Sequence, residues 1–170
     1  MTRQDWLHKW CSYALALLGV WWLDAYLLSR WPVFGVTPIL LPVAVTAVSV
    51  LEGVAGGAGF GLGAGLLWAV AYPGSHGFRV LLLAVLGMFT GALAQYALAQ
   101  TLMGCMLCSA AVLAVVELIR VIQELFFLRT QLWPALCTAT PQLLWTLCWV
   151  PAVYGIFSRV FSRVGGDRLA

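Results

Sequence analysis

The sequence predicts an all-α membrane protein: one integral membrane domain over residues 1–170, built as a bundle of about six transmembrane helices. Composition is the first reason, because 63% of the residues are hydrophobic and only 9% are charged, whereas soluble domains carry roughly 25% charged residues. Length is the second reason, because a spanning helix needs about 20 apolar residues and the chain has 170. Little sequence remains for a domain outside the membrane, which disfavours an enzyme that acts on a large soluble substrate.

The positive charges gather at the two ends of the chain. The formal net charge is +3, and five of the nine basic residues are terminal: Arg3, Lys9, Arg159, Arg163 and Arg168. Basic residues hold helix ends on the cytoplasmic side, and an even number of spans puts both ends on one side, so we expect both termini in the cytoplasm. No cleavage signal follows the first apolar run, so this run is expected to remain as a helix. The sequence has no dense basic face, so nucleic acid is not an expected partner.

The first three helices are predicted from apolar runs and their breaks. The first spans residues 11–29 and ends at Arg30-Trp31-Pro32. The second spans 36–52 and opens at Thr37-Pro38, a cap followed by proline in the first turn. The third spans 56–72 and ends at a Tyr-Pro-Gly turn.

The remaining helices are predicted in the same way. The fourth spans 79–102 and the fifth 105–127, with Gly104 as the break between them. The sixth spans 132–157 and contains two prolines. A polar, basic tail over 158–170 completes the domain.

The most informative segment is GVAGGAGFGLGAG at 53–65, which holds seven glycines in thirteen residues. On a helix, glycines at i, i+4 spacing form one smooth stripe, and small residues on one face let a second helix approach closely in lipid. The stripe predicted here consists of Gly53, Gly57, Gly61 and Gly65. We expect it to dock a transmembrane helix of a partner, and we expect Gly61→Leu to hold that helix away.

A second small-residue motif lies in the fourth predicted helix. Gly87 and Gly91 form a G-x-x-x-G pair. Packing between helices of one chain is the commoner use of such motifs, so one glycine face is expected to be internal and the other to bind a partner. The sequence leaves open which face does which.

Three acidic residues in or near predicted spans are further candidates, because ionisable groups inside a membrane are costly and usually functional. Glu52 lies beside the glycine run, where it is either an interfacial carboxylate or a hydrogen-bond anchor for a partner or a neighbouring helix. Glu117 and Arg120 are spaced i, i+3, which favours an internal ion pair. Asp24 is expected at the membrane interface.

The pattern of cysteines indicates that they have a structural role. Cys105 and Cys108 form a C-x-x-C motif, but a redox enzyme needs reactive thiols at an aqueous face, and a metal site needs about four ligands. Cysteine also serves as a small hydrophobic residue. No catalytic constellation, metal site or cofactor is therefore predicted, and a thiol oxidoreductase stays as a third, less favoured class.

Several motifs together resemble a known family. They are a proline-started apolar helix (37–41), the Gly59-Phe60 pair, Gly-Leu-Leu (65–67), G-F-x-x-L (77–81), the 87–91 motif and Glu117. Over about residues 30–160 the chain resembles MreD, the rod shape-determining membrane protein of bacteria. One departure is that this family often places an aspartate after Gly-Leu-Leu, where Trp68 and Ala69 stand here. The resemblance leaves open whether Glu52 substitutes for that aspartate.

The resemblance implies a non-enzymatic scaffold in the bacterial cytoplasmic (inner) membrane. Its expected partners are MreC, RodA, a class B penicillin-binding protein and the actin-like MreB, together with membrane lipid, and its expected role is to support peptidoglycan synthesis and cell shape. It also implies a fold similar to the substrate-binding (S) subunits of energy-coupling-factor vitamin transporters. Such an S subunit is the alternative function, although the predicted outer loops supply few polar groups for a vitamin pocket.

Overall fold

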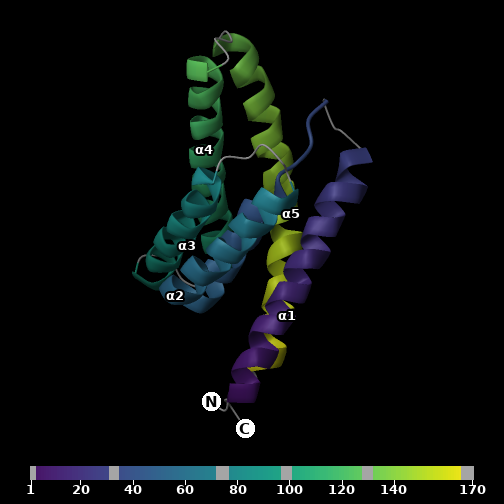
Figure 1. Cartoon of the computed structure of the whole chain (residues 1–170), viewed down its shortest axis with the longest axis vertical. Helices are drawn as coiled ribbons and strands as arrows, with labels where there is room; N and C mark the ends of the chain where they lie inside the picture. The colour runs from purple at the N-terminus through teal and green to yellow at the C-terminus, as the bar shows by residue number, and fades with distance from the viewer. Residues whose placement is uncertain (1–2, 31–34, 72–76, 97–100, 128–131, 166–170) are drawn as a thin grey trace.

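The computed structural model of the chain describes residues 3–30, 35–71, 77–96, 101–127 and 132–165. These residues form five α-helices: α1 (Arg3–Trp22), α2 (Leu40–Ala71), α3 (Phe78–Tyr96), α4 (Leu102–Phe127) and α5 (Leu132–Gly165). A π-helical turn (Leu23–Leu27) and a 3-10 turn (Leu28–Arg30) extend α1. Figure 1 shows the helices arranged as an elongated bundle.

Four helices in the described part of the chain are long and apolar enough to cross a membrane: α2, α3, Leu102–Gln123 of α4 and Cys137–Arg163 of α5. The prediction of an all-α membrane protein is therefore confirmed. The predicted number of six helices is not, because the structure describes five. The difference arises within α2, which covers both the second and the third predicted helix.

Helix α2 reverses direction at Gly53, the one residue inside it with a non-helical backbone. If α2 were straight, Leu41 and Trp68 would lie about 40 Å apart at 1.5 Å per residue. Instead both residues line one cavity. The stretches 40–52 and 54–71, here called the first and second arms, therefore fold back on each other as a helical hairpin.

Glycine is required at this reversal. Gly53 has φ of 80° and ψ of −162°, a backbone region that is essentially restricted to glycine. The predicted break between two helices over 53–55 thus lies at the residue where the chain turns. The consequence is that Gly53 acts as the tip of the hairpin as well as a member of the glycine stripe.

The first arm forms the centre of the bundle. Every residue from Leu40 to Leu51 is buried, and the main hydrophobic core draws side chains from all five helices. A helix that is apolar all round needs neighbours on every side. Helices α1, α3, α4 and α5 all contact α2 and supply this cover.

Both termini lie at the same end of the molecule (Figure 1). The start of α1 and the end of α5 run side by side there, and Leu7 and Val160 line one shallow groove. The tip of the α2 hairpin is at the same end, because Glu52 pairs with Lys9. Asp24 and the start of α2 lie at the opposite end.

Four helix boundaries differ from the prediction. Helix α2 begins at Leu40, so Thr37-Pro38 precede it and do not form its first turn. Helix α1 begins at Arg3 rather than 11, and α5 continues through most of the predicted tail to Gly165. Helix α4 begins at Leu102, so Gly104 lies within it and is not a break. The reason is Thr101, whose Oγ1 accepts a hydrogen bond of 3.2 Å from the Gly104 amide and so caps the helix.

The last part of the predicted fourth helix (97–100) and of the predicted tail (166–170) lies outside the described residues.

Candidate functional site

The predicted glycine stripe is covered by α3 of the same chain. A Cβ atom built on Gly57 would meet the carbonyl oxygen of Gly87, and one on Gly61 would lie 2.5 Å from the carbonyl oxygen of Leu83. A Cβ on Gly65 would lie 2.7 Å from the Cα of Val80. Real Cβ atoms do not come this close to other atoms, so the two backbones touch only because side chains are absent.

The second glycine motif lies on the other side of this same contact. A Cβ on Gly87 would meet the Gly57 carbonyl, and one on Gly91 would lie 2.6–2.7 Å from backbone atoms of Gly53 and Val54. The structure thus packs the two predicted glycine faces against each other. Neither face is open to a partner helix while α2 and α3 stay together.

A different glycine face of α2 is open. Gly59 and Gly63 are exposed, and a Cβ built on either would meet nothing within 4 Å. They lie on the side of the helix away from Gly61, because residues two positions apart point in nearly opposite directions. With α1 they form a groove of about 420 Å³, whose walls include Trp10, Leu18 and Leu67. Sequence spacing could have found this i, i+4 pair, but gave no reason to rank it above the longer stripe.

Glu52 is held inside the chain by α1. Its Oε2 atom forms an ion pair of 2.5 Å with Nζ of Lys9, and its Oε1 atom accepts a hydrogen bond of 2.7 Å from the Tyr13 hydroxyl. Both charged side chains are mostly buried, at 17% and 10% exposed. Of the roles considered for Glu52, the structure shows an anchor to a neighbouring helix.

An aromatic cluster supports this anchor. The Tyr13 ring lies 6.3 Å from the ring centroids of both Phe60 and Phe157, which are 5.7 Å apart. These three rings belong to α1, α2 and α5, and aromatic pairs in this range stabilise beyond the area that they bury. The end of the bundle near the termini is thereby fixed by apolar as well as charged contacts.

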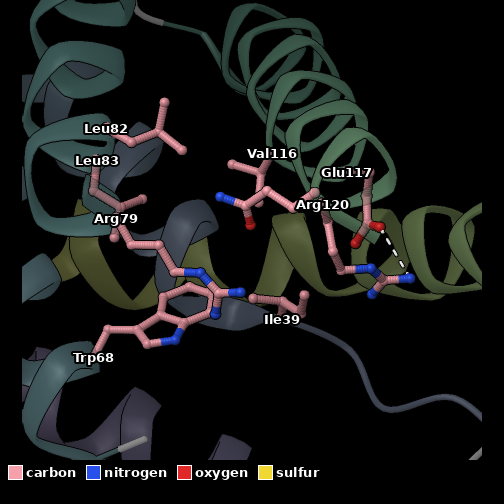
Figure 2. Close-up of a pocket in the computed structure, with 9 residues that line it drawn as sticks. Ile39, Trp68, Arg79, Leu82, Leu83, Val116, Glu117 and Arg120 are labelled. Carbon is pink, nitrogen blue, oxygen red and sulfur yellow. Dashed lines mark ion pairs between the residues drawn. The ribbon is translucent and has the colours of Figure 1, made fainter. Parts of the chain in front are cut away.

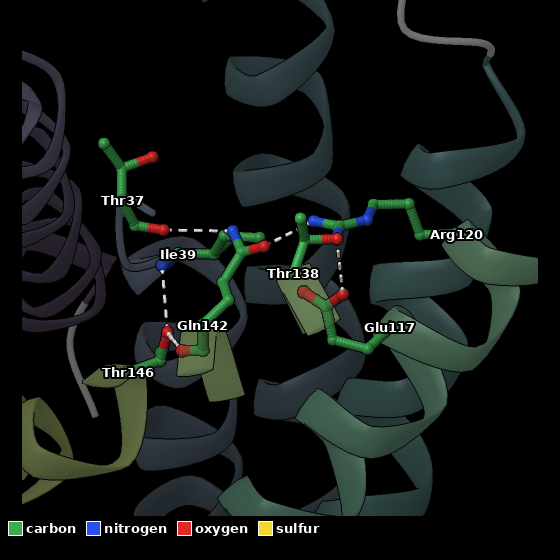
Figure 3. Close-up of polar contacts among 7 residues, drawn as sticks. All are labelled: Thr37, Ile39, Glu117, Arg120, Thr138, Gln142 and Thr146. Carbon is green, nitrogen blue, oxygen red and sulfur yellow. Dashed lines mark hydrogen bonds and ion pairs between the residues drawn. The ribbon is translucent and has the colours of Figure 1, made fainter. Parts of the chain in front are cut away.

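A polar network holds the opposite end (Figure 3). Gln142 of α5 donates a hydrogen bond of 3.0 Å to the Thr37 carbonyl and accepts a hydrogen bond from Arg120 of α4. Arg120 also forms an ion pair of 3.4 Å with Glu117, which agrees with the internal pair predicted from their spacing. Thr146 accepts a hydrogen bond of 3.2 Å from the Ile39 amide. The network thus ties α4 and α5 to the segment that leads into α2.

Asp24 is also part of the fold at this end. It is buried, and its carboxylate accepts a hydrogen bond from the backbone amide of Leu40. Leu40 is the first residue of α2, so Asp24 satisfies an amide that has no partner within the helix. Asp24 is thus a buried cap supplied by another element, and its position at the membrane interface stays a prediction.

A cavity lies between these polar groups and α3. It has a volume of about 230 Å³, and Asp24, Thr37, Trp68 and Arg79 are among its walls. The Arg79 guanidinium carbon lies 5.7 Å from the centroid of the Trp68 ring, a cation–π contact. Figure 2 shows Arg79 extended over Trp68 in the neighbouring, smaller cavity that they share.

Cys105 and Cys108 face the core of the bundle. Both are buried and unbridged. The Cys105 sulfur lies 3.9 Å from the Ser109 hydroxyl, which in turn is 2.8 Å from the hydroxyl of Thr46. This environment fits the packing role predicted for the C-x-x-C motif.

Comparison with family models, with curated proteins and with solved structures found no match for this chain.

Proposed function

We propose that this protein is a non-enzymatic membrane scaffold that binds a transmembrane helix of a partner protein in the groove between α1 and the second arm of α2. The observation that carries the proposal is the open pair Gly59 and Gly63, where a neighbouring backbone can come close without meeting a side chain. The groove belongs to a helix that is apolar enough to span a membrane. Its occupant is therefore itself membrane-embedded.

The other face of α2 supports a helix as the occupant. There, glycines at the same i, i+4 spacing accept α3 with its backbone in contact. Transmembrane helices associate through such small-residue faces rather than through the hydrophobic effect. The groove offers a second surface of the same kind, flanked by the side chains of Trp10 and Leu18 that would pack around the incoming helix.

The pairing of charged side chains supports a role without chemistry. Lys9 with Glu52, and Glu117 with Arg120, form ion pairs inside the bundle. Charges used in this way fix the positions of helices. A bundle held by such pairs, with an open groove at Gly59 and Gly63, suits a protein whose role is recognition.

The motif resemblance to MreD supplies the proposed setting. In this proposal the partner is MreC, and the assembly is the cell-wall elongation complex with RodA, a class B penicillin-binding protein and MreB. Both termini face the cytoplasm of a bacterial inner membrane.

Mild solubilisation of the tagged protein from its own cells, followed by mass spectrometry of everything that co-purifies, tests this proposal. Recovery of MreC, and its loss with Gly63→Leu, is the expected result. A matched control is Gly155→Leu on α5, where a Cβ also meets nothing within 4 Å. Recovery of a paired ATPase module with its coupling subunit would contradict the scaffold and favour a transporter S subunit.

A further inference from the structure

A groove lies between the start of α1 and the end of α5, at the end of the molecule that holds both termini (Figure 1). It has a volume of about 500 Å³, which is in the usual range for ligand sites. One wall is formed by residues of α1 between Leu7 and Ala16, and the other by Val160 and Arg163 of α5. None of these residues lines the groove at Gly63, so the two grooves are separate.

The walls of this groove change from polar to apolar along its length. His8 and Arg163 lie toward the helix ends. Leu15 and Ala16 lie about two helical turns further into the bundle, roughly 10 Å from His8 at 1.5 Å per residue. Arg163 is also the last residue of Cys137–Arg163, the stretch of α5 that is long and apolar enough to cross a membrane. If this stretch spans the bilayer, the polar end of the groove lies at the membrane boundary and the apolar end within the hydrocarbon.

The two basic side chains at the polar end are available to a ligand. His8 and Arg163 are exposed, and neither side chain makes a hydrogen bond or ion pair among the residues that the structure describes. The nearby Lys9, in contrast, pairs with Glu52. A guanidinium presents five N–H donors in a planar fork that matches phosphate, and an imidazole adds a further N–H donor. The polar end is therefore equipped to bind an oxyanion.

The helix ends around the groove carry an excess of positive charge. Over residues 3–12 and 156–165 the sequence has one acidic residue, Asp5, and four basic residues: Arg3, Lys9, Arg159 and Arg163. Because Lys9 is balanced by Glu52, three arginines and one aspartate remain. Such a surface attracts anions.

We propose that this groove binds one anionic phospholipid, with the lipid phosphate at Arg163 and His8 and an acyl chain along Leu15 and Ala16. Basic pockets between membrane helices bind lipid headgroups in this way. Leu15 is 76% exposed, so an acyl chain can lie against it without displacing another side chain. A helix suits this groove less well, because no glycine lines it to admit a second backbone. This inference goes beyond the proposed scaffold and does not depend on the groove at Gly63.

Competition between two lipids tests the proposal. Purified protein would be placed in nanodiscs that contain equal amounts of phosphatidylglycerol and phosphatidylcholine, released into mild detergent and examined by native mass spectrometry. Preferential retention of phosphatidylglycerol is expected. Arg163→Gln should lower its retention about fivefold, since a basic residue contributes about 1 kcal/mol to the binding of anionic lipid. Adding His8→Gln should lower it further.

Arg159→Gln is the matched control. Arg159 is an exposed arginine on the same helix, about one turn before Arg163, and it does not line the groove. The variant removes the same charge from the same end of the molecule. Phosphatidylglycerol retention should therefore stay close to that of the unchanged protein. Equal losses with Arg159→Gln and Arg163→Gln would overturn the proposal, because the lipid would then respond to diffuse charge and not to the groove.

The apolar half of the groove is tested separately. A photoreactive amino acid at Leu15 in living cells is expected to crosslink to phospholipid. A protein crosslink from this position, to a partner or to a second copy of the chain, would overturn the proposal. Equal retention of the two lipids by the unchanged protein would overturn it as well.

Discussion

Gly57 of α2 and Gly87 of α3 are in backbone contact. A Cβ atom built on either residue would meet the carbonyl oxygen of the other. This contact, continued by Gly61 and Gly91, joins the second arm of α2 to α3 along its length. It converts two sequence motifs that resemble partner-binding stripes into one internal interface. The glycines of α2 thus serve two faces, one filled by the chain itself and one open.

Gly61→Leu is expected to destabilise the protein rather than to release a partner. The leucine side chain would meet the α3 backbone, and overpacking of this kind costs about 1–3 kcal/mol. The measurement is the midpoint of thermal unfolding in detergent, read by fluorescence-detected size-exclusion chromatography. Gly59→Leu is the matched control on the same helix, since it meets no atom. Equal midpoints for the two variants would mean that α3 does not pack against this face.

Gly53→Ala is expected to lower stability by about 1–3 kcal/mol, because alanine is strained at φ of 80° and ψ of −162°. Gly59→Ala is expected not to lower stability. Gly59 lies in a helix with space around it, so alanine there is expected to be neutral or stabilising by about 0.5–1 kcal/mol. The same unfolding measurement checks both. A neutral Gly53→Ala would argue against the sharp reversal within α2.

Lys9 and Glu52 are expected to be energetically coupled. Lys9→Met leaves the Glu52 carboxylate mostly buried with the Tyr13 hydroxyl as its remaining partner among the described residues, so a loss of about 1–3 kcal/mol is expected. Adding Glu52→Gln should recover part of that loss, since contacting residues show coupling energies of about 0.5–3 kcal/mol. A double-mutant cycle of unfolding free energies measures the coupling. Additive losses would show that the pair is not formed in the membrane.

Cys105→Ala combined with Cys108→Ala is expected to leave function intact. Both thiols are buried in the hydrophobic core, so the cost is a small cavity there. Growth and cell shape of a strain carrying the double variant would be compared with those of the parent. Loss of shape with normal protein levels would revive a thiol-based activity.

The sequence predicted the features that depend on local pattern. Hydropathy indicated the membrane class, the glycine run marked the break at Gly53, and the i, i+3 spacing predicted the Glu117–Arg120 pair. Local pattern also indicates where α4 begins. Thr101 is a good capping residue three positions before Gly104, and recognising it would have placed Gly104 inside α4.

The remaining features depend on contacts distant in sequence. Glycine spacing identifies a smooth face but not the helix that covers it, so the internal use of Gly57 and Gly61 could not be deduced. Gln142 bonds to Thr37 across 105 residues, and Lys9 to Glu52 across 43. The cavity at Arg79 likewise exists only when α2 folds back on itself, and no linear pattern encodes its walls.

Site-specific photocrosslinking in living cells tests most directly whether the groove at Gly59 and Gly63 binds a partner helix. A photoreactive amino acid at Gly63 would sit in the open groove, and one at Phe89 on α3 would sit on an exposed apolar face outside it. We expect a protein crosslink to a transmembrane helix of MreC from position 63 and none from position 89. A protein crosslink from position 89 alone, or from neither position, would contradict the groove as the binding site.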